Sequence, residues 1–513
     1  MKKIKFKSIT KTLIADTVTP VGLYLKFNTL SSLQRFFKDT IIYGVAAVLP
    51  RAINILLTKL HTQTLKSDKY ADNTWYFVFA AYFIAFLTFG LETAFFRFFS
   101  KEKEKGKIVS TSFLTLVGST LLFLFVLLYF NESIASTLGF DDPLHLKILT
   151  FVTALDLLVV IPYAYLRVNN KPLKFTFFKV VNILIYAFFN LFFLWFIPYA
   201  LKNNISLPSI LTDYYQKTPT VVFIFIANLV ASFITFLMLL PNVLKFKFEY
   251  DIKILQKMLL YGLPIMVGSL AYVTNENLDK LLLGDMLGKE QMGIYAACYK
   301  LGVFMTLYIM AFRLGAEPFF FNHSHKENAK ETYAKILTWF TIIGALFMLI
   351  VVVYINLFAG ILLGKPEYYQ ALAIVPIILL ANLFLGIYNN LSVWYKLTDK
   401  TKYGMYFSVM GAILTIVLNL ILIPKIGFMA SAWATLITYS VMTVFSYFYG
   451  KKYYKVPYNI SKILLYIFVS VVFSFISYFY FQENYIVSTL LIIAFVIFIS
   501  INESSDLKKI IRP

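Results

Sequence analysis

Residues 257–321 read KMLLYGLPIMVGSLAYVTNENLDKLLLGDMLGKEQMGIYAACYKLGVFMTLYIMAFRLGAEPFFF. The stretch contains two apolar runs of membrane-crossing length, joined by a polar hairpin. Ionisable side chains stand among the apolar residues: Glu276, Asp279, Lys300, Arg313 and Glu317. An ionised side chain inside a bilayer is costly unless it faces a wet cavity or a partner. These charges therefore indicate function, and the apolar runs around them decide the class of fold.

The composition extends this pattern to the whole chain. Of its 513 residues, 59% are hydrophobic and only 14% are charged, whereas about a quarter of the residues in a soluble domain are charged. We therefore predict an all-α polytopic membrane protein. The net charge of +21 comes from short basic clusters between apolar runs, which indicates membrane topology and no nucleic-acid partner. The single cysteine, Cys298, excludes an intrachain disulfide framework.

Fourteen apolar runs of about 20 residues predict fourteen transmembrane helices. An even number of helices places both termini on one side of the membrane. The loops on that side are rich in Lys and Arg, as at residues 97–107, 245–257 and 451–462, whereas residues 482–485 have none. Because cytoplasmic loops carry the excess of Lys and Arg, we expect both termini to be cytoplasmic.

A segment in the second half of the sequence resembles a segment in the first half. GAEPFFF at residues 315–321 resembles GLETAFF at residues 90–96, and each lies late in a predicted span. We interpret residues 1–32 as a leader and residues 33–245 and 246–450 as two six-helix lobes. Residues 451–513 then hold two additional helices. Parallel repeats of this kind suit alternating access to a site between the lobes. The alternative is that aromatic-rich helices resemble one another through composition alone.

Three cations lie deep in predicted spans. Arg51 follows a helix-kinking proline, and its forked guanidinium matches phosphate oxygens. Asn54 follows it at helical spacing, and Lys300 and Arg313 lie in the eighth span. We predict that these four residues bind an anionic substrate. The alternative for Arg51 is that its side chain only extends to the membrane interface.

Four carboxylates are candidates for gating or ion coupling. Asp156 lies near the middle of the fourth span, where it predicts a proton or sodium site or a partner for Arg51. Glu92 and Glu317 occupy equivalent places in the two halves. Glu317 follows Arg313 by four residues, so the two side chains share a helix face, and we expect an ion-pair gate there. A structural salt bridge at the interface is the alternative. Glu276 is the fourth candidate.

Enzyme motifs are absent from the sequence. It has no P-loop, no G-x-S-x-G and no H-E-x-x-H, and its four histidines are too scattered for a metal site. We therefore predict neither an enzyme nor a cofactor or metal. An ion gradient, the membrane potential or the substrate gradient must supply the energy of transport, and Na⁺ or H⁺ is the expected coupling ion.

The leader has an unrelated resemblance. Its run MKKIKFKSITKTLIADTVTPVGLYLKF, at residues 1–27, looks like the amino-terminal segment of anthranilate synthase large subunits. Nothing downstream continues this likeness, so a remnant of gene fusion or a chance match is favoured over any chorismate chemistry.

Five segments of the remaining chain resemble bacterial polysaccharide flippases of the Wzx type, in the multidrug/oligosaccharidyl-lipid/polysaccharide exporter superfamily. They read FFKDTIIYG, GLETAFFRF, NENLDKLLL, GIYAACYKLGVFMTL and AFRLGAEPFFF. The resemblance implies a V-shaped, MATE-like fold with a cationic cavity in the bacterial inner membrane. It implies transport of an undecaprenyl-diphosphate-linked oligosaccharide for O-antigen, lipopolysaccharide or capsule synthesis, with a polysaccharide polymerase as a further partner. Arg51, Lys300 and Arg313 would then face the diphosphate.

Two rival functions share this fold. A lipid II flippase has the same number of helices and also carries a diphosphate. A multidrug or cation antiporter would use Asp156, Glu92 or Glu276 as its ion site and would favour cationic drugs, which the arginines inside the membrane oppose.

Overall fold

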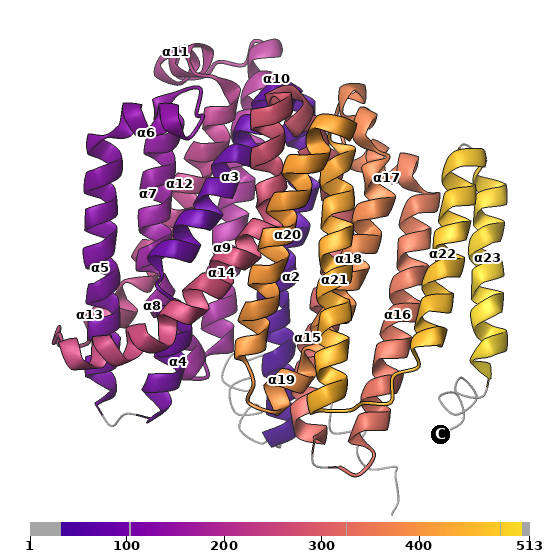
Figure 1. Ribbon diagram of the computed structural model, residues 1–513. Coiled ribbons are helices and arrows are strands. Elements are labelled where there is room, and N and C mark those ends of the chain that lie inside the picture. Colours follow the sequence, from indigo (N-terminus) through magenta and orange to yellow (C-terminus); the bar gives the residue numbers. More distant parts are fainter. Residues whose placement is uncertain (1–31, 102–103, 325, 483, 505–513) are drawn as a thin grey trace, which may run out of the picture.

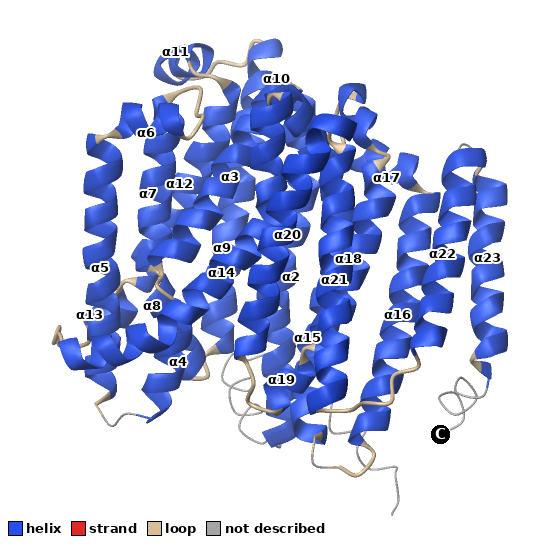
Figure 2. Cartoon of the chain, viewed as in Figure 1, coloured by secondary structure: helices blue, strands red, loops and turns tan. Residues whose placement is uncertain are grey.

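The computed structural model describes residues 32–101, 104–324, 326–482 and 484–504; within them, the side chains at 32–41, 43, 243, 317–318 and 321–322 are not described. The anthranilate-synthase-like leader therefore lies outside the described residues. Every regular element within these ranges is a helix (Figure 2). The prediction of an all-α polytopic protein is confirmed.

The first half of the chain forms one group of helices, on the left of Figure 1. Within it, α7 packs against α5 and α12, and α9 packs against α12 and α2. Its elements are α2 (Ser32–Thr64), α3 (Ser67–Leu87), α4 (Leu91–Lys101), α5 (Lys105–Tyr129), α6 (Asn131–Thr137), α7 (Pro143–Leu158), α8 (Val160–Val168), α9 (Pro172–Leu191), the π-helical η2 (Phe192–Phe196), α10 (Ile197–Lys202), α11 (Ser209–Lys217), α12 (Thr220–Leu239) and α13 (Pro241–Leu244).

The second half forms a second group, in which α18 packs on α21 and α20 packs on both α14 and α21. The last two helices, α22 and α23, pack on α16 at the edge of the bundle (Figure 1). These elements are α14 (Ile252–Leu287), α15 (Lys289–His323), α16 (Ala329–Val353), α17 (Ile355–Leu362), the 3-10 helix η3 (Pro366–Ala371), α18 (Ile374–Leu391), α19 (Val393–Leu397), α20 (Lys402–Ile426), α21 (Met429–Tyr453), α22 (Ile460–Tyr480) and α23 (Tyr485–Asn502).

Thirteen helical segments within the described residues are long and apolar enough to cross a membrane. Helix α2, with 33 residues, runs through the bundle beside them and makes a fourteenth long helix. Several spans are interrupted: α3 and α4 meet at Phe89 and Gly90, both with positive φ, where α4 changes direction. The predicted fourteen spans therefore agree closely with the structure.

The polar hairpin expected between the two central spans is mostly helical. Helices α14 and α15 have 36 and 35 residues and meet at Gly288, whose φ of 90° suits a residue without a Cβ. The polar residues between Asn275 and Lys280 lie inside α14 because neighbouring helices supply partners for them. Hydrophobicity alone placed the end of this span too early.

The two halves meet along a seam at one end of the bundle, which we call the far end; α2 begins and α23 ends at the opposite end, which we call the basic end (Figure 1). They also touch nearer the basic end, where α14 packs on α4. At the far end, α15 packs against α2 and α3. The Lys59 ammonium donates to the carbonyl oxygens of Gly360 and Leu363, each at 2.7 Å. The Lys365 ammonium donates to the Leu65 carbonyl at 2.7 Å. The seam therefore closes the far end.

Candidate functional site

A cavity of about 440 Å³ lies between the two halves, beneath the seam. Its walls come from α2, α3, α14, α15 and α18, with Tyr186 from α9. Five of the predicted substrate-binding and coupling residues line this cavity: Arg51, Asn54, Lys300, Arg313 and Glu276. Residues as far apart in the sequence as positions 51 and 389 thus line one cavity, because each half contributes part of its wall.

Two of the cavity cations have no hydrogen-bond or ion-pair partner among the described residues. Neither the Arg51 guanidinium nor the Lys300 ammonium forms a hydrogen bond or ion pair with any residue that the structure describes. Arg51 is exposed to the cavity and Lys300 is half-buried. A cation inside a membrane protein is costly without a counter-charge or water. Their arrangement suits a mobile anion that occupies the cavity between them.

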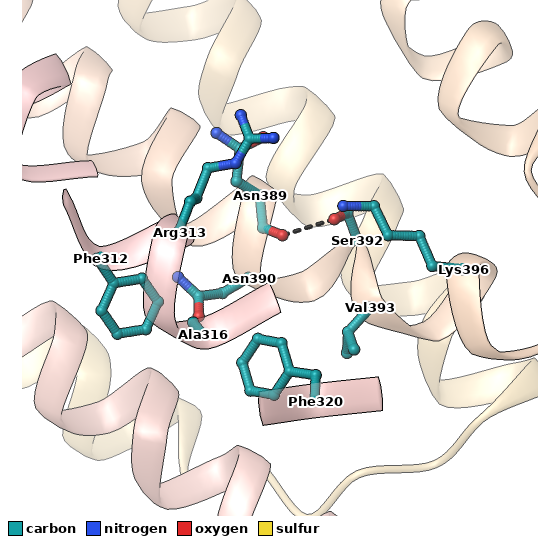
Figure 3. A pocket seen from close by; sticks show the side chains of 9 residues that line it. All are labelled: Phe312, Arg313, Ala316, Phe320, Asn389, Asn390, Ser392, Val393 and Lys396. Carbon is teal, nitrogen blue, oxygen red and sulfur yellow. Dashed lines mark hydrogen bonds between the residues drawn. The ribbon is translucent and has the colours of Figure 1, made fainter. Parts of the chain in front are cut away.

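Arg313 lies lower on α15, beside Asn389 of α18 (Figure 3). The backbone of Asn389 is fixed by the Ser392 hydroxyl, which donates to its carbonyl oxygen at 2.6 Å. Lys396 lies one turn further toward the basic end. Arg313 lines both this cavity and the space below it, so the cationic lining continues toward the basic end.

The cavity carboxylate Glu276 accepts a short hydrogen bond from the Tyr439 hydroxyl. Next to it, Asp279 is buried and accepts from the Lys280 ammonium at 2.9 Å and from the Tyr295 hydroxyl at 2.7 Å. This pair neutralises Lys280, which also lines the cavity. Among the described residues that line the cavity, Arg51 and Lys300 are therefore the cations without a hydrogen-bond or ion-pair partner, and Glu276 is the carboxylate that faces them. Asp279 and Lys280 pair with each other within α14, and α15 contributes the Tyr295 hydroxyl, which the sequence did not indicate.

The other predicted carboxylates lie elsewhere. Glu92 forms a salt bridge with Arg167 at 3.1 Å, and both side chains are 46% exposed. Both residues belong to the first half, so this pair does not join the two halves. Asp156 of α7 accepts from the Ser232 hydroxyl of α12 at 2.8 Å and does not contact Arg51. The side chain of Glu317 lies outside the described residues. Their roles in gating or ion coupling stay predictions.

A larger vestibule of about 1330 Å³ lies below the cavity, at the basic end. It is joined to the cavity through shared lining residues on α14, α15 and α18. Arg97, Lys396, Lys400 and Lys402 supply cations at its wall, and Asp399 supplies one carboxylate. A ligand could therefore pass from the basic end to Arg51, whereas the seam blocks the far end.

A cluster of four ion-paired residues, which we call the far-end cluster, reinforces the seam. The Lys289 ammonium of α15 lies 2.8 Å from Asp72 of α3 and 2.6 Å from Asp141 of the loop before α7. Lys69 contacts the same two carboxylates at 3.2 and 3.4 Å. Asp72 is nearly fully buried, so its two ammonium partners are needed to offset desolvation. Lys289 is the member that ties the second half to the first.

We expect the far-end cluster to hold the seam closed over most of the pH range. Partial burial opposes ionisation of Asp141, but the hydrogen bond and charge of Lys289 and the charge of Lys69 outweigh it, so the pKa of Asp141 lies below its usual value. A depressed pKa stabilises the closed state above the ordinary value of about 3.9, and this contribution is lost as the pH falls through the lower pKa.

The measurement is far-side labelling of Thr58→Cys, a buried cavity position, with a membrane-impermeant maleimide. Labelling should stay slow between about pH 8 and about pH 5 after correction for the chemistry of the reagent, because Asp141 stays ionised. Lys289→Ala should speed it at every pH, and Lys253→Ala, an exposed control at the basic end, should not. Equal rates in the Lys289→Ala variant and the wild type would contradict the role of the cluster.

The fold and the cavity define an α-helical membrane transporter. The chain belongs to the polysaccharide biosynthesis protein family, whose model matches residues 36–322. The MatE family model matches residues 264–421. These matches confirm the prediction of a flippase in the multidrug/oligosaccharidyl-lipid/polysaccharide exporter superfamily.

Solved structures of this superfamily share the fold. The inward closed conformation of the lipid II flippase MurJ has a TM-score of 0.70 at 17% identity and covers 91% of this chain and 100% of its own. An inward-facing multidrug resistance MATE transporter has a TM-score of 0.61 at 10% identity, covering 83% and 99%. A superfamily transporter from Pyrococcus furiosus, described as having a binding pocket of reverse polarity, has a TM-score of 0.59 at 11% identity, covering 82% and 95%.

A curated relative is the probable multidrug resistance protein YpnP of Bacillus subtilis (strain 168). It is 23% identical over 220 residues, which are 41% of this chain. The match spans 48% of that relative, or about half of its length.

Proposed function

We propose that this protein carries an undecaprenyl-diphosphate-linked oligosaccharide from the cytoplasmic to the outer leaflet of the bacterial inner membrane. The product would serve the synthesis of a surface polysaccharide such as O-antigen or capsule. The observation that carries the proposal is the pair of cations, Arg51 and Lys300, that form no ion pair with any described residue and face a cavity between the two halves. A diphosphate offers pairs of oxygens and negative charge, which a guanidinium and an ammonium bind well.

The direction follows from the positions of the basic loops. If the basic end is cytoplasmic, the vestibule opens to the leaflet in which such lipids are made. Opening of the far end and closing of the basic end would then release the cargo on the outer side, as alternating access requires. Glu276 in the cavity and Asp156 in the first half are the carboxylates that we propose for coupling to Na⁺ or H⁺.

Lipid II and a cationic drug are the two alternative cargoes. Lipid II also carries a diphosphate, and the lipid II flippase MurJ shares the fold, so the same cations would suit it. A cationic drug suits the cavity poorly, because Arg51 and Lys300, which form no ion pair with any described residue, would repel it. The diphosphate-linked lipids are therefore favoured over the drugs.

Transport by the purified protein in liposomes tests the function. A fluorescent undecaprenyl-diphosphate-linked oligosaccharide, fluorescent lipid II and the cation ethidium would be compared, with the two lipids followed by the rate at which an external reagent reaches them. We expect transport of the oligosaccharide lipid that exceeds transport of lipid II, and no movement of ethidium. Selective movement of lipid II would assign the second function, and movement of ethidium alone would assign the drug antiporter.

A further inference from the structure

The vestibule has an unusual aromatic lining. Every aromatic side chain among the described residues that line it is a tyrosine, although the chain as a whole contains 53 phenylalanines and only 36 tyrosines. All of them come from helices of the second half. They are Tyr261, Tyr272, Tyr388, Tyr395, Tyr403, Tyr406 and Tyr439. A wall that contacts a prenyl tail gains nothing from phenol hydroxyls, so this lining favours a cargo with both apolar faces and polar edges.

Two of the rings are open to the vestibule. Tyr272 is 51% exposed and Tyr406 is 52% exposed. Neither hydroxyl has a hydrogen-bond partner among the residues that the structure describes. Both rings therefore offer a face and a hydroxyl to a ligand, as amphipathic tyrosines do at binding surfaces.

The two rings lie on neighbouring helices. A Cβ at Gly268 of α14 would lie 3.7 Å from the Met405 side chain of α20, so the helices touch there. Tyr272 follows Gly268 by one helical turn, and Tyr406 follows Met405 directly. Tyr272 also lines the upper cavity that contains Arg51. The ring of Tyr272 thus stands at the junction between the cations and the vestibule.

The ring of Tyr406 packs against a group of aromatic side chains. Tyr403 packs beneath Tyr406 at 5.9 Å between ring centroids. Its ring also contacts Trp394 at 5.2 Å, and its hydroxyl lies 2.9 Å from that of Tyr453. A ring held in place by such packing loses little conformational freedom when a ligand binds.

We propose that Tyr272 and Tyr406 form a saccharide-binding platform, which holds the sugar part of the cargo while the cavity cations hold the diphosphate. A pyranose ring has an apolar C–H face and a rim of hydroxyls, which complement the ring face and the hydroxyl of tyrosine. This inference rests on the proposed function. It adds the residues that recognise the sugar and places them nearer the basic end than the diphosphate.

Binding titrations of the full chain in detergent test the platform with two probes. One is a short-chain prenyl diphosphate, and the other is the same molecule with N-acetylglucosamine attached to the diphosphate. We expect the wild type to bind the sugar-bearing probe more tightly. Tyr272→Ala and Tyr406→Ala should each weaken that binding by roughly three- to tenfold. Tyr406→Ala should leave binding of the sugar-free probe unchanged, and Tyr272→Ala, whose ring also lines the cavity with the cations, should weaken it less than it weakens the sugar-bearing probe. Tyr480→Ala, a change to a tyrosine that is 72% exposed at the end of α22, is the matched control.

The outcomes separate this inference from the proposed function. Retained binding of the sugar-free probe shows that a variant is folded. Equal wild-type affinity for the two probes, or variants that weaken both equally, would overturn the platform and leave the diphosphate site standing. Wild-type protein that binds neither probe would contradict the proposed function and this inference together.

Discussion

Replacing Arg51 with alanine should reduce transport of a diphosphate-linked lipid by about tenfold to a hundredfold, the equivalent of one or two charge-assisted hydrogen bonds. The guanidinium faces the cavity and forms no hydrogen bond or ion pair with any described residue, so its removal breaks no such contact and should cost little stability. Arg51→Lys should keep part of the activity, because the charge remains and the forked geometry is lost. Arg313→Ala should show a smaller loss, since Arg313 lies at the edge shared with the vestibule.

The measurement is the initial rate of transport in liposomes at equal amounts of reconstituted protein. Lys253→Ala provides the control, because it removes an exposed cation of the basic end that lines neither the cavity nor the vestibule. Unchanged transport in Arg51→Ala would contradict the proposal that Arg51 binds the diphosphate. In cells, the same variant should fail to relieve accumulation of the lipid-linked oligosaccharide on the cytoplasmic side when it replaces the wild type.

Gly293→Val should prevent the seam from closing and reduce transport at least about tenfold. Gly293 of α15 lies directly on the first turn of α3: an added Cβ would lie 3.3 Å from the Ala71 backbone nitrogen and closer still to the Ser67 carbonyl. These are backbone atoms, so the helices must separate to make room. Overpacking of this kind costs about 1–3 kcal/mol, which is enough to shift a two-state equilibrium strongly.

Two readouts check this prediction. Thr58→Cys in the Gly293→Val background should react with impermeant maleimide from the far side, whereas in the wild-type background it should react slowly. Gly360→Val is the control, because nothing lies within 4 Å of the position that its Cβ would take, although Gly360 is also at the far end. Wild-type labelling and transport in Gly293→Val would show that the seam does not have to close tightly.

Several features of the fold were readable from the sequence because each depends on a local property. Hydrophobic runs of bilayer length predicted the helices, and basic loops predicted one common side for both termini. Arg51, Lys300 and Arg313 were identifiable because a cation in an apolar run is costly wherever it lies. Residues 90–96 and 315–321 suggested two halves, and that repeat stays a prediction.

Partnerships between distant side chains were not readable. Glu92 seemed suited to a gate near Arg97, yet it pairs with Arg167 from the end of another span. Asp279 pairs with its neighbour Lys280, but its second partner, the Tyr295 hydroxyl at 2.7 Å, comes from α15 and was not apparent from the sequence. Such pairs depend on the rotation of each helix about its axis, which hydrophobicity constrains weakly when a helix is surrounded by protein on most sides.

The sequence by itself determined that this chain is a helical membrane protein with cations at depth, because bilayer length and the cost of buried charge apply to each segment separately. The tertiary structure alone decided which of those charges share a cavity and which end of it is closed. It also brought seven tyrosines from five helices to one vestibule. The physical reason is that a cavity is a property of the packing between helices: its lining is set by how the two halves meet.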